Sequence, residues 1–338
     1  MSIGADIGTA FLVSARQDAN NQLKIKSIRD AFFEVDNETA IKNMLQMSQV
    51  NYVEAGDKLY IIGENANVMA NIFKREVRRP MAKGVLSPGE LDAEKILLLL
   101  LDNIMGKAIV KDEVCYYSVP AAPTDREIDI IYHQAMFSKL IGSLGYKPIA
   151  MNEAAAIVYS NAAKEQFSAI GISCGAGMVN IALMYKTMIG MSYSITNSGD
   201  WIDESAAKAT GTTAARIQAI KEKGVDLLNP SDGDDPRTIR EREAITIYYK
   251  SLALRILDSL KNEFIKKQAS IELPCAIPMI ISGGTAKAKN FLEFFKSAFE
   301  TVKDKFPIPV SEIRMASDPL NAVAQGLLVV ALNQEATK

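Results

Sequence analysis

The chain has little of what disulfide frameworks and metal centres need. Among its 338 residues are three cysteines and a single histidine, His133. The cysteines are odd in number and widely spaced, so we expect no disulfide framework, and their pattern favours a reducing compartment. One histidine cannot complete a zinc cluster with such cysteines. We therefore expect His133 on the surface of a helix.

Long apolar runs are absent as well. The longest wholly apolar run covers residues 96–101, far short of the roughly 20 residues that a bilayer span needs. We expect this run inside a core helix that begins at Pro88, is capped by Ser87 and Glu90, and ends at Gly106. The first apolar strand begins at Ile3, so we expect no signal peptide and a cytoplasmic protein.

Neither sign of charge dominates the composition. The formal net charge is -2, which argues against nucleic acid as a direct partner, because binding to the phosphate backbone needs a concentrated basic face. We interpret the densest basic cluster, residues 74–79, as a solvated helix end. Hydrophobic residues make up 48% and charged residues 23% of the chain, a composition typical of a globular protein.

What the chain does have is an internal repeat. Residues 3–9 and residues 170–176 each end an apolar strand in a turn of small residues, and a second apolar run follows each turn. Both stretches predict β-hairpins with glycine at the tip. Glycine lets the backbone approach a ligand closely, and consecutive free N–H groups in such a turn form a concave donor site for phosphate oxygens. The repeat therefore predicts two related half-molecules that hold a phosphate group between them.

Strands alternate with helices in both halves, which predicts an α/β fold with two sheets. In the first half we expect a strand over 114–119 and a helix over 124–144. In the second half we expect a long amphipathic helix through Phe264 and a buried strand over 278–282. The predicted domain I comprises residues 1–148 and 320–338, with a small subdomain at about 31–73, and domain II comprises residues 149–319, with a small subdomain at about 198–250.

The motifs of the common nucleotide-binding loops are missing. No segment matches the P-loop pattern, and residues 175–177 lack the third glycine of a dinucleotide fingerprint. A nucleotide can also be gripped by hairpin turns, with a carboxylate at the strand end that holds Mg²⁺ through its waters. Asp6 stands at such a strand end. By itself, an aspartate there would more often cap its own backbone; the second hairpin favours the metal role.

Five segments resemble, in the same order, the motifs of the actin and heat-shock ATPase superfamily. They are the first phosphate turn at residues 6–10, the first connecting helix at 152–156, the second phosphate turn at 175–177, the adenosine motif at 281–285 and the second connecting helix at 318–326. Residues 61–66, 79–86 and 199–204 further resemble the bacterial actin MreB and the magnetosome filament protein MamK.

The resemblance implies a two-lobed actin-like fold, which is a duplicated ribonuclease H-like fold with a nucleotide cleft between the lobes. It also implies a prokaryotic actin-like ATPase that binds ATP and Mg²⁺, hydrolyses ATP slowly and polymerises into cytoskeletal filaments. The chain itself would then be the main partner, through head-to-tail contacts that do not close into a ring. Cargo or membrane adaptor proteins would be further partners.

Carried over to this sequence, the resemblance implies a role for each motif. Asp6 would bind Mg²⁺ through water, and Glu153 would orient the attacking water. The residues that would contact the nucleotide are Gly8, Thr9 and Ala10 at the β-phosphate, Gly175, Ala176 and Gly177 at the γ-phosphate, Gly283, Gly284 and Thr285 at the adenosine, and Arg216 or Lys221 at the base.

Four positions depart from the motifs of the superfamily. Ser173 stands where the second turn usually has an aspartate that helps to hold the waters of the metal, and Met178 stands where a threonine is usual. The helix that contacts ribose usually carries glutamate and lysine, and this chain has Ala215 and Gln218 there. Because an uncharged hydroxyl binds Mg²⁺ poorly, we expect hydrolysis to be slow.

Two other functions stay open at this point. A small-metabolite kinase of the same fold would need a catalytic base beyond Glu153, and no insertion suggests a substrate site. A nucleotide-binding scaffold that has lost hydrolysis would agree with Ser173. A heat-shock chaperone would need a C-terminal peptide-binding module, and we expect none after residue 338.

Overall fold

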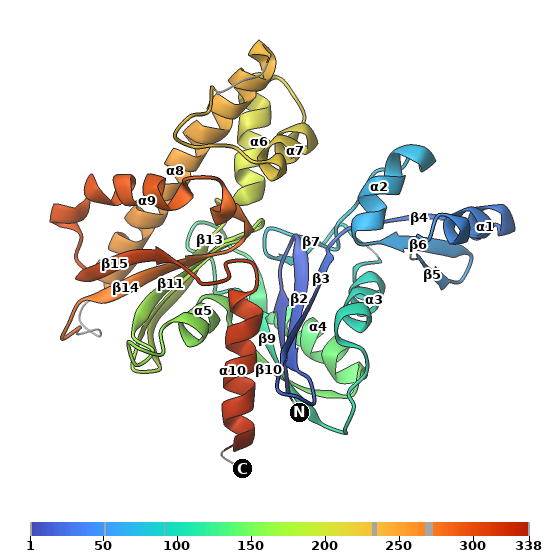
Figure 1. Cartoon of the computed structure of the whole chain (residues 1–338), viewed down its shortest axis with the longest axis horizontal. Helices are drawn as coiled ribbons and strands as arrows, with labels where there is room; N and C mark the ends of the chain where they lie inside the picture. Colours follow the sequence, from blue (N-terminus) through green and yellow to red (C-terminus); the bar gives the residue numbers. More distant parts are fainter. Residues whose placement is uncertain (1, 51, 91, 232–234, 268–272, 337–338) are drawn as a thin grey trace.

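The computed structural model describes residues 2–50, 52–90, 92–231, 235–267 and 273–336. They form two lobes, each built on its own five-stranded mixed sheet. Helix α10 (Ala322–Ala336) stands between the lobes (Figure 1). The prediction of an α/β fold with two sheets is confirmed.

The sheet of the first lobe, lobe I, has the strand order β10-β9-β1-β2-β3. β1 pairs antiparallel with β2 and parallel with β9. The strands are β1 (Ser2–Ile7), β2 (Phe11–Gln17), β3 (Leu23–Arg29), β9 (Glu113–Val119) and β10 (Tyr146–Asn152).

The sheet of the second lobe, lobe II, has the strand order β13-β12-β11-β14-β15. β11 pairs antiparallel with β12 and parallel with β14, so the repeat in the sequence corresponds to a duplicated sheet with the same strand order and directions. The strands are β11 (Ala169–Cys174), β12 (Val179–Tyr185), β13 (Met188–Ile195), β14 (Ile277–Ser282) and β15 (Val310–Met315).

Apolar helices cover both sheets and form the two main cores. The apolar run at residues 96–101 lies in α3, where Ile96, Leu97, Leu100 and Leu101 are buried against lobe I. Lobe I is covered by α3 (Ala93–Met105) and α4 (Ile130–Ser143), and lobe II by α8 (Pro236–Lys267) and α9 (Phe291–Glu300).

Two helices cross where the lobes join. α5 (Glu153–Asn161) and α10 pack so closely that a Cβ atom on Gly326 would lie 1.8 Å from the carbonyl oxygen of Ala156. A Cβ atom on Gly4 of β1 would lie 2.3 Å from the carbonyl oxygen of Ala324. The small residues of these segments therefore serve helix and strand contacts at the joint.

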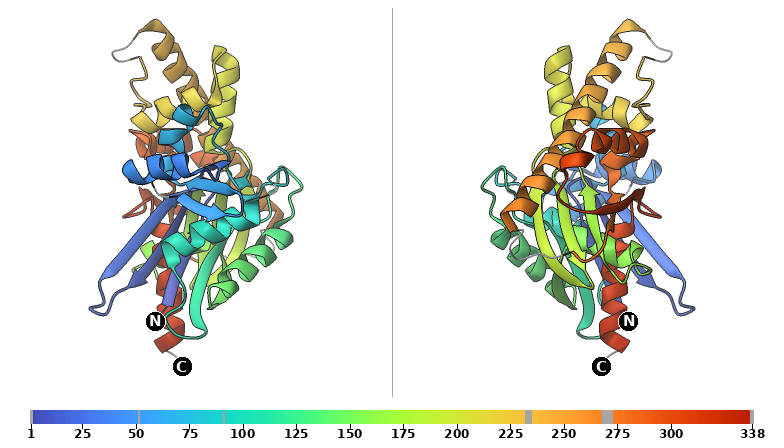
Figure 2. Two further views of the ribbon diagram at one scale, coloured as in Figure 1. Left: turned by 90° about the vertical axis from the view of Figure 1, so that its right-hand side faces the viewer. Right: turned by 90° about the vertical axis from the view of Figure 1, so that its left-hand side faces the viewer.

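Each lobe carries a smaller extension toward the upper end of the molecule (Figures 1 and 2). The extension of lobe I has a three-stranded sheet in the order β4-β6-β5. It comprises β4 (Phe32–Asp36), α1 (Thr39–Met47), β5 (Tyr52–Ala55), β6 (Lys58–Ile62) and α2 (Glu64–Phe73), and the extension of lobe II comprises α6 (Gly199–Thr210), α7 (Ala214–Lys223) and the first part of α8. The remaining short elements are β7 (Met81–Ala82), β8 (Val85–Leu86) and the 3-10 helices η2 (Gly284–Lys287) and η3 (Lys303–Lys305).

Two helices begin later than predicted. α3 begins at Ala93 and not at Pro88, and the Glu90 carboxylate lies 3.4 Å from Arg78 instead of closing a capping box. α4 begins at Ile130 and not near residue 124, because the Asp129 side chain accepts hydrogen bonds from the backbone N–H groups of residues 131 and 132. The predicted end of α3 at Gly106 is correct.

The surface position predicted for His133 is wrong. Its side chain is buried on the inner face of α4, with its ring centre 4.8 Å from that of Phe137. The basic cluster at residues 74–79 is also not a purely solvated helix end, because Arg78 and Arg79 form ion pairs with Glu34 and Asp200. These pairs use side chains that lie far away in the sequence.

The predicted domain boundary at residue 148 falls inside β10, which continues in the sheet of lobe I to Asn152. Within the described residues, no helix has the length and apolar character needed to cross a membrane.

Candidate phosphate-binding cleft

A cavity of about 510 Å³ opens between the two lobes. Both glycine turns line it, residues 8–10 from the β1–β2 hairpin and residues 175–178 from the β11–β12 hairpin. The corresponding hairpins of the duplicated sheets thus face the same space, as the repeat predicts.

The first turn depends on glycine at residue 8. The N–H of Gly8 donates to the carbonyl oxygen of Phe11 at 3.1 Å, and a Cβ atom on Gly8 would lie 2.6 Å from that oxygen. Thr9 is buried, and its Oγ1 accepts a hydrogen bond from the backbone N–H of Gly84 at 3.1 Å. The Thr9 hydroxyl is thereby held at the floor of the turn.

The second turn comes close to the first. The N–H of Gly175 donates to the carbonyl oxygen of Met178 at 3.0 Å. A Cβ atom on Gly177 would lie 2.3 Å from the N of Gly84 and 2.4 Å from Oγ1 of Thr9. Only glycine leaves room for the two turns and the β7–β8 loop to meet.

Asp6 lies at the end of β1 and lines the cavity. The Ser118 hydroxyl at the end of β9 donates to Oδ1 of Asp6 at 2.9 Å and accepts from the N–H of Ile7 at 2.7 Å. Burial raises the pKa of Asp6 to about 6, although the hydrogen bond from Ser118 opposes the shift. A raised pKa is expected for a half-buried carboxyl group that the surrounding protein shields from much of the solvent.

Glu153 is the first residue of α5 and lines the same cavity. Ser173 donates to its Oε1 at 2.5 Å, and Nδ2 of Asn180 donates to its Oε2 at 2.8 Å. Burial, and then the charge of Asp6, raises the pKa of Glu153 to about 8. Ser173, which stands in place of the usual aspartate, therefore positions Glu153 through a hydrogen bond.

The two carboxyl groups suit a hydrated cation that is shared with phosphate. Among the described residues no group of three or more histidine, cysteine, aspartate or glutamate side chains could hold a metal ion. Mg²⁺ is usually held by one or two carboxylates together with waters and substrate phosphates. Asp6 and Glu153 fit that donor set, because burial and then the charge of Asp6 raise the pKa of Glu153, and a cation would offset that charge.

The segment after β14 forms another wall of the cavity. Gly283 has φ of 100°, and a Cβ atom there would lie 2.3 Å from the carbonyl oxygen of Cys174. Thr285 donates through Oγ1 to the carbonyl oxygen of Gly175 at 2.7 Å. Gly283, Gly284 and Thr285 all line the cavity, so the structure brings the three together with both phosphate turns.

Helix α7 brings one of the two residues predicted at the base to the cavity. Arg216 lies outside the cavity, because its Nε donates to Glu241 of α8 at 2.7 Å. Gln218, Lys221 and Glu222 line the cavity instead. Of the two predicted base contacts, the structure brings only Lys221 to the cleft.

Sequence reasoning missed several polar residues of the cleft. Asn180 is a lone polar residue in the apolar strand β12, and that isolation was an available signal. Ser118 and Arg29 carried no such signal. Arg29 reaches from the end of β3 to Glu222, with nitrogen–oxygen distances of 3.1 and 3.2 Å.

Comparison with known proteins found a family model and several solved structures that match nearly the full length of the chain. A family model described as Volactin matches residues 1–331, whereas a comparison with curated proteins found no match. A MamK double helical filament has 15% identity and a TM-score of 0.67, with 98% of each chain covered. MreB5 of Spiroplasma citri bound to ADP has 16% identity and a TM-score of 0.65, with 98% of each chain covered. The ethanolamine utilization protein EutJ from Carboxydothermus hydrogenoformans has 14% identity and a TM-score of 0.56, with 97% of this chain and 89% of that chain covered.

These likenesses show that the chain has an actin-like fold, and at 14–16% sequence identity they show the fold alone. The predicted two-lobed actin-like architecture is therefore confirmed.

Proposed function

Because the chain belongs to the Volactin family and has an actin-like fold, we propose that it binds Mg-ATP between its two lobes, hydrolyses it slowly and polymerises into filaments. One observation carries the proposal. Two glycine turns from corresponding places in duplicated sheets meet each other and line one cavity together with two half-buried carboxyl groups, Asp6 and Glu153.

The geometry of the cleft supports a triphosphate as the ligand. Backbone turns that only glycine can form suit close contact with phosphate oxygens. A structure of MreB5 bound to AMPPNP, at 16% identity, has the same fold. In the proposed complex, Gly8, Thr9 and Ala10 contact the β-phosphate, and the turn at residues 175–177 surrounds the γ-phosphate.

The donor groups around the two carboxyls support a magnesium-dependent site. Asp6 would hold Mg²⁺ through water, and Ser118 orients its carboxylate. When bound, Mg²⁺ would supply positive charge that offsets the charge of the phosphates. Gly283, Gly284 and Thr285 would accommodate the adenosine, and Lys221 and Gln218 line the same cavity.

Slow hydrolysis follows from the surroundings of Glu153. In phosphoryl transfer the protein acts mainly by positioning and by electrostatics. Ser173 and Asn180 hold both carboxyl oxygens of Glu153, which places it to orient a water. Without a bound ligand, burial and the charge of Asp6 raise the pKa of Glu153 to about 8, and a carboxyl group that binds its proton so firmly is a poor acceptor for the proton of that water until a cation offsets the charge of Asp6.

Polymerisation is proposed from the fold and from the relatives. MamK, which shares this fold, forms a double helical filament. Repeated contacts between unlike surfaces give a filament when they do not close into a ring. The chain would therefore be its own main partner.

The test combines nucleotide binding with sedimentation. We expect AMPPNP to bind in the presence of Mg²⁺ in isothermal titration calorimetry, and we expect protein to pellet with Mg-ATP and much less without nucleotide. The proposal would be refuted if the same amount of protein pelleted with and without nucleotide, or if an added metabolite became phosphorylated while no filaments formed. Filaments that form with Mg-ATP but release no phosphate would instead support the alternative of a nucleotide-binding scaffold that has lost hydrolysis.

A further inference from the structure

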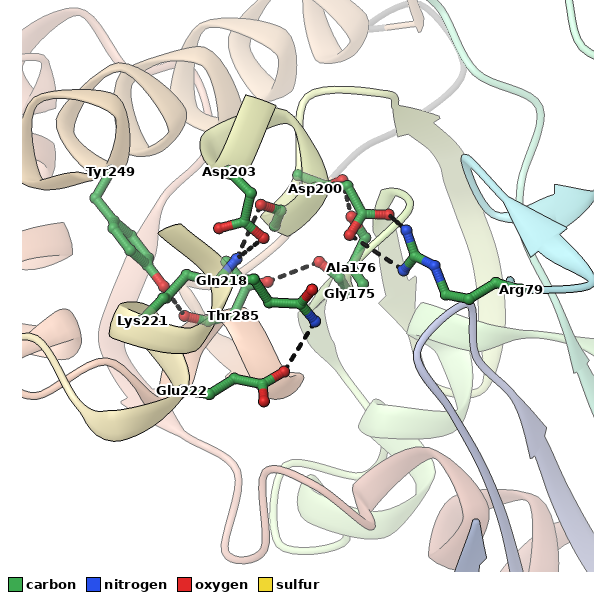
Figure 3. A network of polar contacts seen from close by, with 12 residues as sticks. Arg79, Gly175, Ala176, Asp200, Asp203, Gln218, Lys221, Glu222, Tyr249 and Thr285 are labelled. Carbon is green, nitrogen blue, oxygen red and sulfur yellow. Dashed lines mark hydrogen bonds and ion pairs between the residues drawn. The ribbon is translucent and has the colours of Figure 1, made fainter. Parts of the chain in front are cut away.

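One side chain of lobe I reaches the element behind the second phosphate turn. The Arg79 guanidinium forms two parallel hydrogen bonds with the Asp200 carboxylate, Nη1 to Oδ1 at 3.2 Å and Nη2 to Oδ2 at 2.9 Å (Figure 3). Arg79 lies between α2 and β7 in lobe I, and Asp200 lies in the first turn of α6 in lobe II. A bidentate pair of this kind fixes direction as well as distance.

The backbone of Asp200 holds the turn itself. Its N–H donates to the carbonyl oxygen of Ala176 at 2.9 Å, and the N–H of Gly199 donates to the carbonyl oxygen of Gly175 at 3.2 Å. The Ser198 hydroxyl donates to Ala176 as well. Asp200 thus binds the turn through its backbone N–H and binds Arg79 of lobe I through its side chain.

Neighbouring contacts pack the start of α6 closely against the turn. A Cβ atom on Gly199 would lie 2.5 Å from Oγ1 of Thr285, which itself donates to Gly175. Nζ of Lys221 donates to the carbonyl oxygen of Gly199 at 2.9 Å and to Oδ2 of Asp203 at 2.7 Å (Figure 3). The start of α6 and the turn at residues 175–177 are therefore expected to move as one unit.

The segment that carries Arg79 also touches the turns from the side of lobe I. Gly84, five residues further on, donates to Thr9 and lies against Gly177. Asp200 also lines the cavity, so its pairing with Arg79 offsets a negative charge that would otherwise repel a bound phosphate.

We propose that Arg79 and Asp200 are positioning residues that couple closure of the lobes to the shape of the second turn. The ion pair makes the cleft select a nucleoside triphosphate over a diphosphate, because the second turn is the part that meets the γ-phosphate. This inference rests on the proposed binding of a nucleotide between the lobes.

The test compares AMPPNP and ADP, each with Mg²⁺, by isothermal titration calorimetry. Arg79→Gln is expected to weaken AMPPNP binding about tenfold, a typical coupling between linked sites, and to change ADP binding less than about twofold. Arg79→Lys keeps the charge but loses the planar fork, so its effect is intermediate. Lys139→Gln is the matched control, because it removes a positive charge of lobe I that pairs with Glu94 at the surface, and it should change neither affinity.

A second variant separates the ion pair from a general loss of structure. Arg79→Gln combined with Asp200→Asn removes the unpaired carboxylate, so the double variant should bind AMPPNP more tightly than Arg79→Gln alone. Trp201, the single tryptophan, lies beside Asp200, and its fluorescence change on AMPPNP binding should shrink in Arg79→Gln while the melting temperature stays near that of the wild type.

The outcomes distinguish the two proposals. If the wild type binds neither AMPPNP nor ADP, the proposed function is refuted and the inference with it. If the wild type binds both, but Arg79→Gln weakens both equally or neither, or the double variant binds no better than Arg79→Gln, then only the role of the ion pair is refuted.

Discussion

Replacing Gly326 by alanine tests whether the α5–α10 crossing sets the joint between the lobes. The added Cβ atom would lie 1.8 Å from the carbonyl oxygen of Ala156 and 2.6 Å from its carbon. Contact becomes ordinary at 3.4 Å, so the two helices would have to separate by roughly 1.5 Å in an interior that is packed too densely to absorb the change. Both obstacles are backbone atoms, which cannot rotate away as a side chain can.

The magnitude follows from two opposing terms. Overpacking in a core costs about 1–3 kcal/mol, and a backbone obstacle places this variant near the upper end. Alanine gains about 1 kcal/mol over glycine in helix propensity. We therefore expect Gly326→Ala to lower the free energy of unfolding by about 2 kcal/mol. Because α5 begins at Glu153, the same change should also weaken binding of AMPPNP.

Gly142→Ala on α4 is the matched control, because no atom lies within 4 Å of a Cβ atom added there. Gly142→Ala should therefore show only the gain in helix propensity, without a steric clash, and should stabilise the protein by up to about 1 kcal/mol. Urea unfolding followed by circular dichroism and by Trp201 fluorescence measures both variants. If Gly326→Ala proves as stable as Gly142→Ala, the close helix crossing is not real and the reasoning fails.

Three further predictions concern buried groups. Burial lowers the pKa of His133 from 6.5 to about 4, so the stability that its neutral form contributes is complete above pH 6.5 and is lost as the pH falls toward 4. The wild type should therefore lose about 2 kcal/mol of unfolding free energy between pH 7 and pH 5, and His133→Leu should abolish this loss. The same pH dependence of urea unfolding in wild type and variant would contradict this. Ser173→Asp adds a carboxyl group beside Glu153 and should lower the melting temperature of the protein without Mg²⁺. Addition of Mg-AMPPNP should then raise the melting temperature of the variant more than that of the wild type. An equal increase in both proteins would speak against the metal site. Glu153→Ala should leave filaments intact but slow phosphate release, and an unchanged release rate would remove Glu153 from its proposed role.

The elements that depend on neighbouring residues were predictable. Both hairpins follow from apolar runs around a glycine turn, and the apolar run at residues 96–101 lies in a core helix as expected. The start of α3 was not predictable, because Glu90 pairs with Arg78 across the fold instead of capping the helix. His133 was misplaced because one residue has no periodicity that would show which face of its helix it occupies.

The candidate site was predictable where it depends on local motifs and not where it depends on contacts between distant segments. Asp6, Glu153 and both glycine turns line one cavity, as expected from their motifs, and their roles toward a nucleotide remain predictions. The position of Arg216 outside the cavity was not predictable, because its partner Glu241 lies on another helix. The link from Ser173 to Glu153 forms only once β11 and α5 are packed together.

The duplicated strand–turn–strand units, and the glycines that let their turns approach a ligand, follow from neighbouring residues alone, since backbone conformation and apolar alternation are local properties. Which charged side chains meet across the cleft depends on the packing of the whole chain. Arg79 and Asp200 are 121 positions apart, and many other pairings of opposite charge in this chain are equally compatible with the sequence. Their meeting depends on how the lobes are placed, which is set by the packing of α5 against α10 and not by any local pattern.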